Sequence, residues 1–226
     1  MQIMATIASG LQAVKLRMER AAKAPVALLA VSKTWPAQAV REAHAAGQKA
    51  FGESYVQEAL GKMKELSDLD LEWHFIGPVQ GNKARAIAEH FDWVHSVDRE
   101  KIALKLSEAR PESLPPLQVC IQVNISGEAS KSGMAPAEVP NLAKIIGGLP
   151  NLRLRGLMTI PEPTRDEKLQ RARFSELRKL KEQLCASGFD LDTLSMGMSE
   201  DMESAILEGA TMVRVGSAIF GTRDRK

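Results

Sequence analysis

The sequence predicts an α/β protein, a single (β/α)8 TIM barrel over residues 1–226 with an extra N-terminal helix. Short β-prone runs alternate with longer amphipathic runs along the 226 residues, and this alternation implies parallel strands joined by right-handed crossovers. Eight such units favour a barrel, because closure removes both edges of the sheet. An open doubly wound sheet is the alternative, but no Gly-x-Gly-x-x-Gly follows the first strand-like run.

A leading helix is expected over 5–23, where apolar residues recur at helical spacing among charged ones. The eight expected strands are 26–31, 49–52, 72–76, 93–97, 117–124, 153–159, 193–196 and 212–216. The helices expected between them are 36–46, 55–66, 82–90, 99–108, 136–147, 166–187 and 200–208. The run at 200–208 begins directly after Ser199, and Ser199-Glu200-Asp201 is typical of a helix N-cap with acids in the first turn.

Composition excludes several classes of protein. Apolar residues make up 44% of the chain and charged residues 26%, which is typical of a globular domain and unlike a disordered one. A net charge of +2 predicts no nucleic-acid or membrane partner. No apolar run approaches the roughly 18 residues of a membrane span, and the N-terminus does not resemble a signal peptide. Cys120 and Cys185 lie far apart, so we expect no disulfide and a cytoplasmic location.

The chemistry should lie where the strands end, because active groups of a parallel barrel gather at the C-terminal ends of its strands. The residues at these positions are Lys33, Glu53 to Tyr55, His74 with Gly77, His95 with Ser96, Asn124, Met158 with Thr159, Met196 to Ser199, and Arg214 to Ser217. If the barrel closes, all of them converge on one mouth.

Lys33 ends the first strand-like run in "VALLAVSKTWP". Taken alone, Lys33 is better interpreted as a lysine at the edge of the barrel, whose aliphatic side chain packs on the protein while its amine reaches water. The functional reading is a Schiff-base lysine, since a desolvated amine near another cation loses its proton more readily and can attack a carbonyl. Arg214, in the last strand, would adjoin the first strand on closure and could be that cation.

The C-terminal stretch "LSMGMSEDMESAILEGATMVRVGSAIFG" is the most informative one. Ser199 follows the seventh strand, and Gly216-Ser217 follows the eighth. Many barrels bind a phosphate there with backbone amides and a helix N-terminus, although glycine and serine are also ordinary turn residues. A lysine, an arginine and a phosphate site around one mouth together suggest pyridoxal 5′-phosphate.

Other candidates are weaker. His74, in "EWHFIG", and His95 are more often hydrogen-bonded core residues than ligand contacts. Four dispersed histidines and two distant cysteines match no metal-ligand spacing. A nucleophile elbow needs Gly-x-Ser-x-Gly, and the order in "SMGMS" is reversed. The methionines of that stretch are expected to fill the core.

Seven stretches, in order along residues 26 to 223, resemble one family. They are "AVSKTWP", "FGESYVQEA", "WHFIGPVQGNKAR", "HSVDREKIA", "QVNISGEASKSGM", "RGLMTIPEP" and "LSMGMSEDMESAILEGATMVRVGSAIFGTR". They are similar to those of the pyridoxal 5′-phosphate homeostasis proteins, and the first and last are highly specific. The resemblance implies the fold of the alanine racemase N-terminal domain.

It also implies roles for single residues. Lys33 would bind pyridoxal 5′-phosphate as an internal aldimine, Ser199, Gly216 and Ser217 would hold its phosphate, and Arg214 would face the pyridine nitrogen. The family usually has asparagine where this chain has Ser54. Serine is shorter and lacks the amide's two donors, so the contact implied there is in doubt.

The resemblance implies a protein that buffers or delivers the cofactor, with cofactor-dependent apo-enzymes as partners. The alternative is a small amino-acid racemase. Racemases of this type take a catalytic tyrosine from a second domain, whereas the one tyrosine here, Tyr55, lies in the second strand–helix loop. We therefore expect a carrier without fast turnover, and a monomer. A protein that only interacts with others would not need a lysine and a phosphate site inside a barrel.

Overall fold

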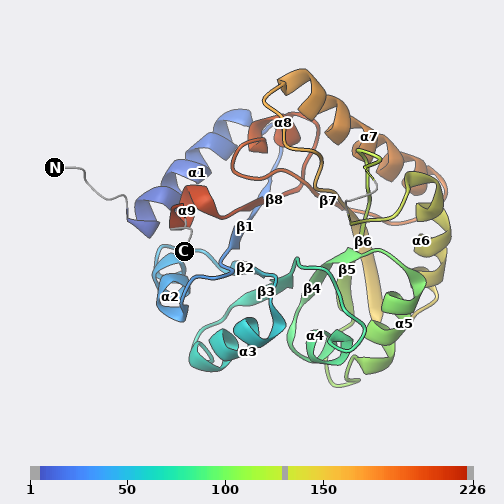
Figure 1. Cartoon of the computed structure of the whole chain (residues 1–226), viewed down its shortest axis with the longest axis horizontal. Helices are drawn as coiled ribbons and strands as arrows, with labels where there is room; N and C mark the ends of the chain where they lie inside the picture. Colours follow the sequence, from blue (N-terminus) through green and yellow to red (C-terminus); the bar gives the residue numbers. More distant parts are fainter. Residues whose placement is uncertain (1–5, 129–131, 223–226) are drawn as a thin grey trace.

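Eight parallel strands close into a barrel in the order β1 to β8, as the sequence predicts (Figure 1). The computed structural model describes residues 6–128 and 132–222. Its strands are β1 (Ala27–Val31), β2 (Ala50–Glu53), β3 (Glu72–Phe75), β4 (Trp93–Val97), β5 (Leu117–Gln122), β6 (Leu152–Met158), β7 (Thr193–Ser195) and β8 (Met212–Val215). Each lies at one of the eight predicted runs, with ends that differ by at most a few residues.

Closure occurs between the first and last strands. β1 pairs with β8 in parallel, and Leu29 lies opposite Arg214 in the register. This confirms that the last strand, with Arg214, adjoins the strand that leads to Lys33. The carboxyl ends of all eight strands therefore surround one mouth of the barrel.

Helices cover the outside of the barrel. They are α1 (Ile7–Ala21), α2 (Ala37–Ala45), α3 (Val56–Glu65), α4 (Ala84–His90), α5 (Glu100–Ala109), α6 (Val139–Gly147, after the 3-10 turn Pro136–Glu138), α7 (Glu167–Ala186), α8 (Met202–Leu207) and α9 (Ser217–Phe220). Their inward faces and the outward faces of the strands form the hydrophobic core. None of these helices is long and apolar enough to cross a membrane.

The C-terminal region differs from the prediction at the start of α8, and α9 is a short helix that was not expected. α8 begins two residues later than expected, after Asp201, and Ser199 is not its N-cap. The carboxylate of Asp201 instead accepts a hydrogen bond from the backbone N–H of Met198 at 2.6 Å, which closes a turn before the helix. Ser199 is thereby left outside the helix, with its hydroxyl directed to another element.

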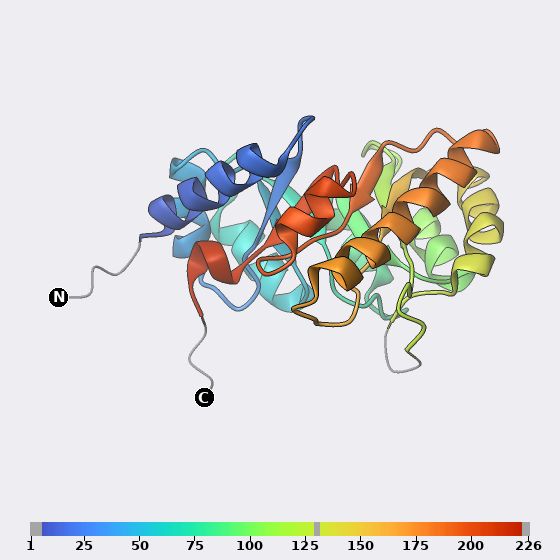
Figure 2. The same cartoon turned by 90° about the horizontal axis from the view of Figure 1, so that it is seen from above.

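The N-terminal helix packs on the last two helices of the chain. Figure 2 shows α1, in blue, running beside the red segments that contain α8 and α9. Gly10 of α1 permits this close approach, because a Cβ atom there would lie 2.7 Å from the carbonyl oxygen of Ile219. The extra helix thus supports the segment that follows β8.

Buried polar side chains lie inside the barrel, among them His74, His95, Ser195 and Arg214. A small apolar layer, formed by Trp93, Cys120 and Met158, is separate from the main core. Cys120 is fully buried, and burial raises the pKa of its thiol to about 12. Both cysteines are free thiols.

Candidate functional site

Lys33 lies at the mouth, two residues after β1. Its side chain is partly buried, and it lines a pocket of about 690 Å³. Ser54, Tyr55 and Gln122 line the same pocket from the ends of β2 and β5, and Lys83 lines it from the segment before α4. The pocket therefore lies where the barrel rule places a site.

A buried ion pair supports the chain on either side of Lys33. The Nζ atom of Lys62, in α3, lies 2.7 Å from a carboxylate oxygen of Glu53 and donates to the carbonyl oxygen of Ser32 at 2.8 Å. The Ser32 hydroxyl donates to the same Glu53 oxygen at 2.7 Å. The residue immediately before Lys33 is thus fixed through its backbone and its side chain.

The residue immediately after Lys33 is fixed as well. Thr34 has a φ of 68°, a left-handed conformation that β-branched residues rarely adopt. Its backbone N–H donates to the carboxylate of Glu58, which also accepts a hydrogen bond from Lys62 at 2.6 Å. Strained backbone of this kind persists only where its surroundings hold it. The contacts therefore fix the backbone on both sides of Lys33 at the mouth.

The predicted phosphate-binding residues lie close together on the β8 side of the seam, the place where β1 pairs with β8. The hydroxyl groups of Ser199 and Ser217 lie 3.1 Å apart, although 18 residues separate them in the chain. Gly216 lies against the end of β1, since a Cβ atom there would be 3.2 Å from the carbonyl oxygen of Val31. A side chain at this position would crowd the strand that leads to Lys33.

The N-terminal helix holds this group of residues in place. Arg17 of α1 donates to the carbonyl oxygen of Ser199 at 3.0 Å and to both carboxylate oxygens of Glu203 at 2.7 and 2.8 Å. The guanidinium thereby links α1 to the loop after β7 and to the first turn of α8. We identify Arg17 as a supporting residue that its sequence pattern did not single out.

Arg214 is buried inside the barrel. Its guanidinium donates to the hydroxyl of Ser195 at 2.8 Å and to the carbonyl oxygen of Thr159 at 2.9 Å. Burial lowers its pKa to about 10, and Asp201 opposes that shift as a nearby negative charge. A buried cation at this place is suited to an electron-rich atom of a ligand.

His74 lies deeper in the barrel than the mouth. Its side chain is fully buried, and its two ring nitrogens lie 2.8 Å from His95 and 2.5 Å from Glu72. It is absent from the lining of the 690 Å³ pocket, so a direct contact with a ligand stays a prediction. Its hydrogen-bonded position in the core is the alternative that the sequence also offered.

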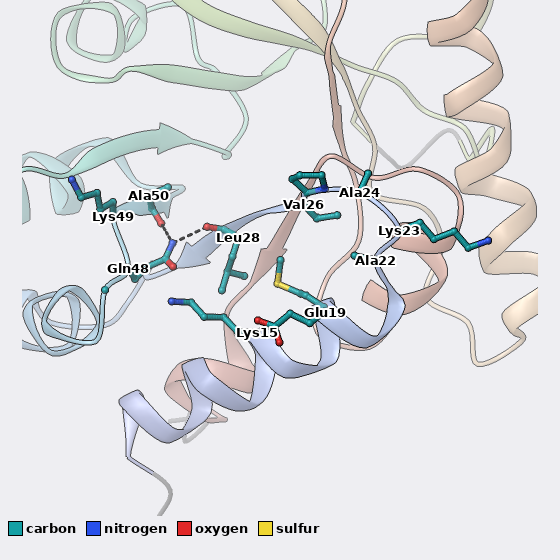
Figure 3. A pocket seen from close by; sticks show the side chains of 13 residues that line it. Lys15, Glu19, Ala22, Lys23, Ala24, Val26, Leu28, Gln48, Lys49 and Ala50 are labelled. Carbon is teal, nitrogen blue, oxygen red and sulfur yellow. Dashed lines mark hydrogen bonds between the residues drawn. The ribbon is translucent and has the colours of Figure 1, made fainter.

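A larger pocket, of about 860 Å³, lies at the opposite end of β1 and β2, against the C-terminal half of α1 (Figure 3). Gln48 in its wall donates to two backbone carbonyl groups, those of Leu28 and Ala50. In Figure 3 the Lys15 side chain extends from α1 toward Gln48, whereas those of Lys23 and Lys49 point away from the pocket. It lies at the amino ends of the strands, away from the residues predicted for chemistry, so the 690 Å³ pocket is the better candidate.

Within residues 6–128 and 132–222, no group of three or more histidine, cysteine or acidic side chains is arranged to hold a metal ion. Of the predicted site residues, Lys33 and Ser54 line one pocket, and Ser199, Gly216 and Ser217 gather nearby across the seam. Residues 129–131, part of the "QVNISGEASKSGM" motif, lie outside the described residues.

Comparison with known proteins identifies the family. The family model described as alanine racemase, N-terminal domain, matches residues 11–224. The pyridoxal phosphate homeostasis protein of Pseudomonas aeruginosa is 63% identical over 227 residues, which cover 98% of this chain and 97% of that protein. The protein of the same name in Escherichia coli K12 is 53% identical and covers 88% of this chain and 86% of that one.

Solved structures agree with these matches. PipY of Synechococcus elongatus, solved with pyridoxal phosphate bound, is 39% identical, has a TM-score of 0.85, and covers 96% of this chain and 100% of that one. Alanine racemase of Corynebacterium glutamicum, at 18% identity and a TM-score of 0.75, shares the fold over 96% of this chain and 61% of its own. The chain therefore belongs to the family of pyridoxal phosphate homeostasis proteins, which have the fold of the alanine racemase N-terminal domain.

Proposed function

We propose that this protein binds pyridoxal 5′-phosphate at the mouth of the barrel and serves in its homeostasis, by holding the cofactor and releasing it to other proteins. The observation that carries the proposal is the convergence of Lys33, Arg214 and the Ser199–Ser217 pair around the β1–β8 seam. Family membership and the relative solved with the cofactor support it.

The donor set fits the chemical groups of the cofactor. The phosphate is a dianion that needs several hydrogen-bond donors, and the hydroxyls of Ser199 and Ser217 supply two in one place. The pyridine nitrogen accepts a hydrogen bond when unprotonated, and the Arg214 guanidinium can only donate. The aldehyde needs an amine, and Lys33 supplies one at the end of β1.

In this proposal, each residue has one role. Lys33 forms the covalent link, Ser199, Gly216 and Ser217 hold the phosphate, and Arg214 faces the ring nitrogen. When bound, the cofactor can act as an electron sink for amino-acid chemistry. A donating arginine keeps the ring nitrogen unprotonated and makes the cofactor a weaker electron sink than a carboxylate partner would, which narrows the chemistry of the site.

Two further residues belong to the proposal. Ser54 and Gly77 line the pocket side by side. A Cβ atom at residue 77 would lie 2.4 Å from the Ser54 carbonyl oxygen, so the glycine lets the two backbone segments approach closely. We propose that its hydroxyl makes a single contact where an asparagine would make two. His74 is assigned an indirect role, because both of its ring nitrogens have protein partners.

We also propose that residues 1–226 act as one domain, as a monomer, in the cytoplasm, and that cofactor-dependent apo-enzymes accept the cofactor. The free thiols of Cys120 and Cys185 support a reducing compartment. Sedimentation of the loaded protein tests the monomer. Transfer of the cofactor from the loaded protein to an apo-transaminase, faster than its release into buffer, tests delivery.

The experiment for cofactor binding is a spectrophotometric titration of the apoprotein with pyridoxal 5′-phosphate. Wild type should develop a visible absorption band, and Lys33→Ala should not, although its far-ultraviolet circular dichroism stays native. Lys83→Ala is the matched control, since Lys83 lines the same pocket. A band that survives Lys33→Ala and disappears in Lys83→Ala would reject the role assigned to Lys33.

A further inference from the structure

A continuous row of hydrogen-bonded side chains crosses the inside of the barrel. It begins at Arg214 in β8, passes through Ser195 in β7, His95 in β4 and His74 in β3, and ends at Glu72. The successive distances are 2.8, 2.7, 2.8 and 2.5 Å. In the closed order, β3 and β4 lie across the barrel from β7 and β8 (Figure 1). The row therefore joins two opposite sides of the barrel.

Its ends differ in position as well as in charge. Arg214 is buried near the carboxyl ends of the strands, whereas Glu72 begins β3, and half of its side chain is exposed. Glu72 also lines a polar depression at the opposite end of the barrel. The row thus reaches from the interior, near the proposed cofactor site, to solvent at the far side.

The chemistry of the two ends sets the direction of every bond. An arginine can only donate, so Ser195 Oγ accepts from Arg214. At the other end a carboxylate can only accept, so with neutral rings the bare nitrogens are His74 Nδ1 and His95 Nδ1, and the Ser195 hydroxyl donates to the latter. His95 is then protonated at Nε2 and donates to His74 Nδ1. His74 is in turn protonated at Nε2 and donates to Glu72, whose carboxylate accepts. Both histidines are neutral in this arrangement.

The surroundings favour this state. Burial lowers the pKa of His74, and it lowers the pKa of His95 well below its ordinary value of 6.5. The hydrogen bond from His74 lowers the pKa of Glu72, so its carboxylate is ionised at neutral pH. The other charged groups that face the row are Asp92 near His74, Arg155 near Glu72, and Asp201 near Arg214.

Packing keeps the rings in place. The ring of His74 stacks on Trp93 with centroids 5.3 Å apart and an angle of 6° between the planes. The guanidinium of Arg155 covers Trp93 at 4.8 Å from its ring centre. A ring held in this way cannot rotate to exchange its two nitrogens without breaking the stack.

We propose that Ser195, His95, His74 and Glu72 are positioning residues that form a one-directional relay, which holds the Arg214 guanidinium in place to donate toward the cofactor ring. Among the described residues, the hydrogen-bond partners of this buried cation include no carboxylate, and the relay connects it to one at a distance. Each donor in the row polarises the next, so the bonds strengthen one another. The role of Arg214 toward the cofactor rests on the function proposed above, but the relay itself does not.

The relay is tested first in the apoprotein by nitrogen-15 NMR of labelled histidines. His74 and His95 should both show a protonated Nε2 and a bare Nδ1 at pH 8, where both rings are expected to be neutral. Substitution of His44 and His90, one at a time, assigns the other two signals. A protonated Nδ1 on either ring, or two protons on His74, would overturn the proposal, because the row would then run in another direction.

The second test measures what the relay does for binding. Wild type should bind pyridoxal 5′-phosphate at least about tenfold more tightly than its 1-deaza analogue, which lacks the ring nitrogen, as expected for a charged hydrogen bond. Ser195→Ala should reduce this preference at least fivefold. Ser204→Ala is the matched control, since Ser204 is a buried serine that bonds to Gln170 outside the row.

The outcomes separate the two proposals. A preference that Ser195→Ala leaves intact would overturn the relay's role while leaving cofactor binding established. Wild type that binds neither compound would reject the proposed function, and the NMR result would still decide whether the relay exists. If Ser195→Ala does not fold, the same comparison with Glu72→Gln decides the role, because the glutamine oxygen can still accept but carries no charge.

Discussion

The Nζ atom of Lys62 lies 2.7 Å from a carboxylate oxygen of Glu53, and the two side chains are only 5% and 0% exposed. This buried ion pair lies behind the residue that precedes Lys33, because Lys62 also donates to the Ser32 carbonyl. The hydrogen bonding of the pair is incomplete, since the second carboxylate oxygen of Glu53 is buried with no hydrogen-bond partner in the described structure. Burial accordingly raises the pKa of Glu53.

Removal of the cation should therefore be costly. Lys62→Ala leaves the Glu53 carboxylate buried without a cation, and we expect the free energy of unfolding to fall by about 3–5 kcal/mol. Urea denaturation measures the loss. Lys64→Ala, at an exposed position of the same helix, is the control and should change stability by less than about 0.5 kcal/mol. Equal effects of the two substitutions would argue against a structural role of the pair.

Gly197 should be essential for the loop that carries Ser199. Its φ of 92° is unfavourable for other residues, and a Cβ atom there would lie 2.6 Å from the Cβ atom of Ala205. We expect Gly197→Ala to lower the free energy of unfolding by more than about 1 kcal/mol. Gly61→Ala is the matched control, because nothing lies within 4 Å of a Cβ atom at that position in α3. It should stabilise the protein by about 1 kcal/mol, and a stabilising Gly197→Ala would contradict the structure.

Arg17 should affect phosphate binding more than stability. Its ion pair with Glu203 is partly exposed, and such pairs contribute about 1 kcal/mol or less. Its bond to the Ser199 carbonyl, however, holds the proposed phosphate site. We expect Arg17→Ala to weaken binding of pyridoxal 5′-phosphate severalfold and to leave binding of pyridoxal, which lacks the phosphate, unchanged. Arg20→Ala, on the same helix, should change neither, and an equal loss for both compounds would refute the phosphate role.

His95 should make the protein less stable in acid. Because burial lowers its folded-state pKa well below 6.5, the unfolded chain binds a proton at this residue as the pH falls below about 6.5, while the folded chain does not. The free energy of unfolding then decreases by at most about 1.4 kcal/mol per pH unit through this group. Above pH 7 the group has no such effect. Urea denaturation between pH 8 and 5.5 should show a shallower pH dependence in His95→Gln than in wild type, and His44→Gln should match wild type.

Much of the fold could be predicted because its signals are local. Each strand is a short apolar run. The alternation of these runs with amphipathic segments is enough to recognise the eight strands and the helices between them. α9 was missed, since four residues between Gly216 and Gly221 carry no helical period. The start of α8 was misplaced because the Ser199-Glu200-Asp201 pattern fits an N-cap, whereas the tertiary contact with Ser217 takes that hydroxyl.

The site could be predicted only in outline. The rule that strand ends converge identified Lys33 and the residues after β7 and β8 without any contact being known. The residues that hold these site residues in place could not be predicted by this rule. The Glu53–Lys62 pair depends on how α3 packs on β2, and the row from Arg214 to Glu72 depends on which strands face each other across the closed barrel. His74 and His95 carried a signal in their strand positions, but their partners are distant in sequence.

The most direct test of the account is the position of the covalent link. The protein, loaded with pyridoxal 5′-phosphate and reduced with borohydride, should give one peptide that carries a pyridoxyl phosphate group, and fragmentation should place that group on Lys33. The visible band should disappear on reduction. A modified Lys83, or a mixture of surface lysines with Lys33 untouched, would contradict the central claim that the amine at the end of β1 holds the cofactor.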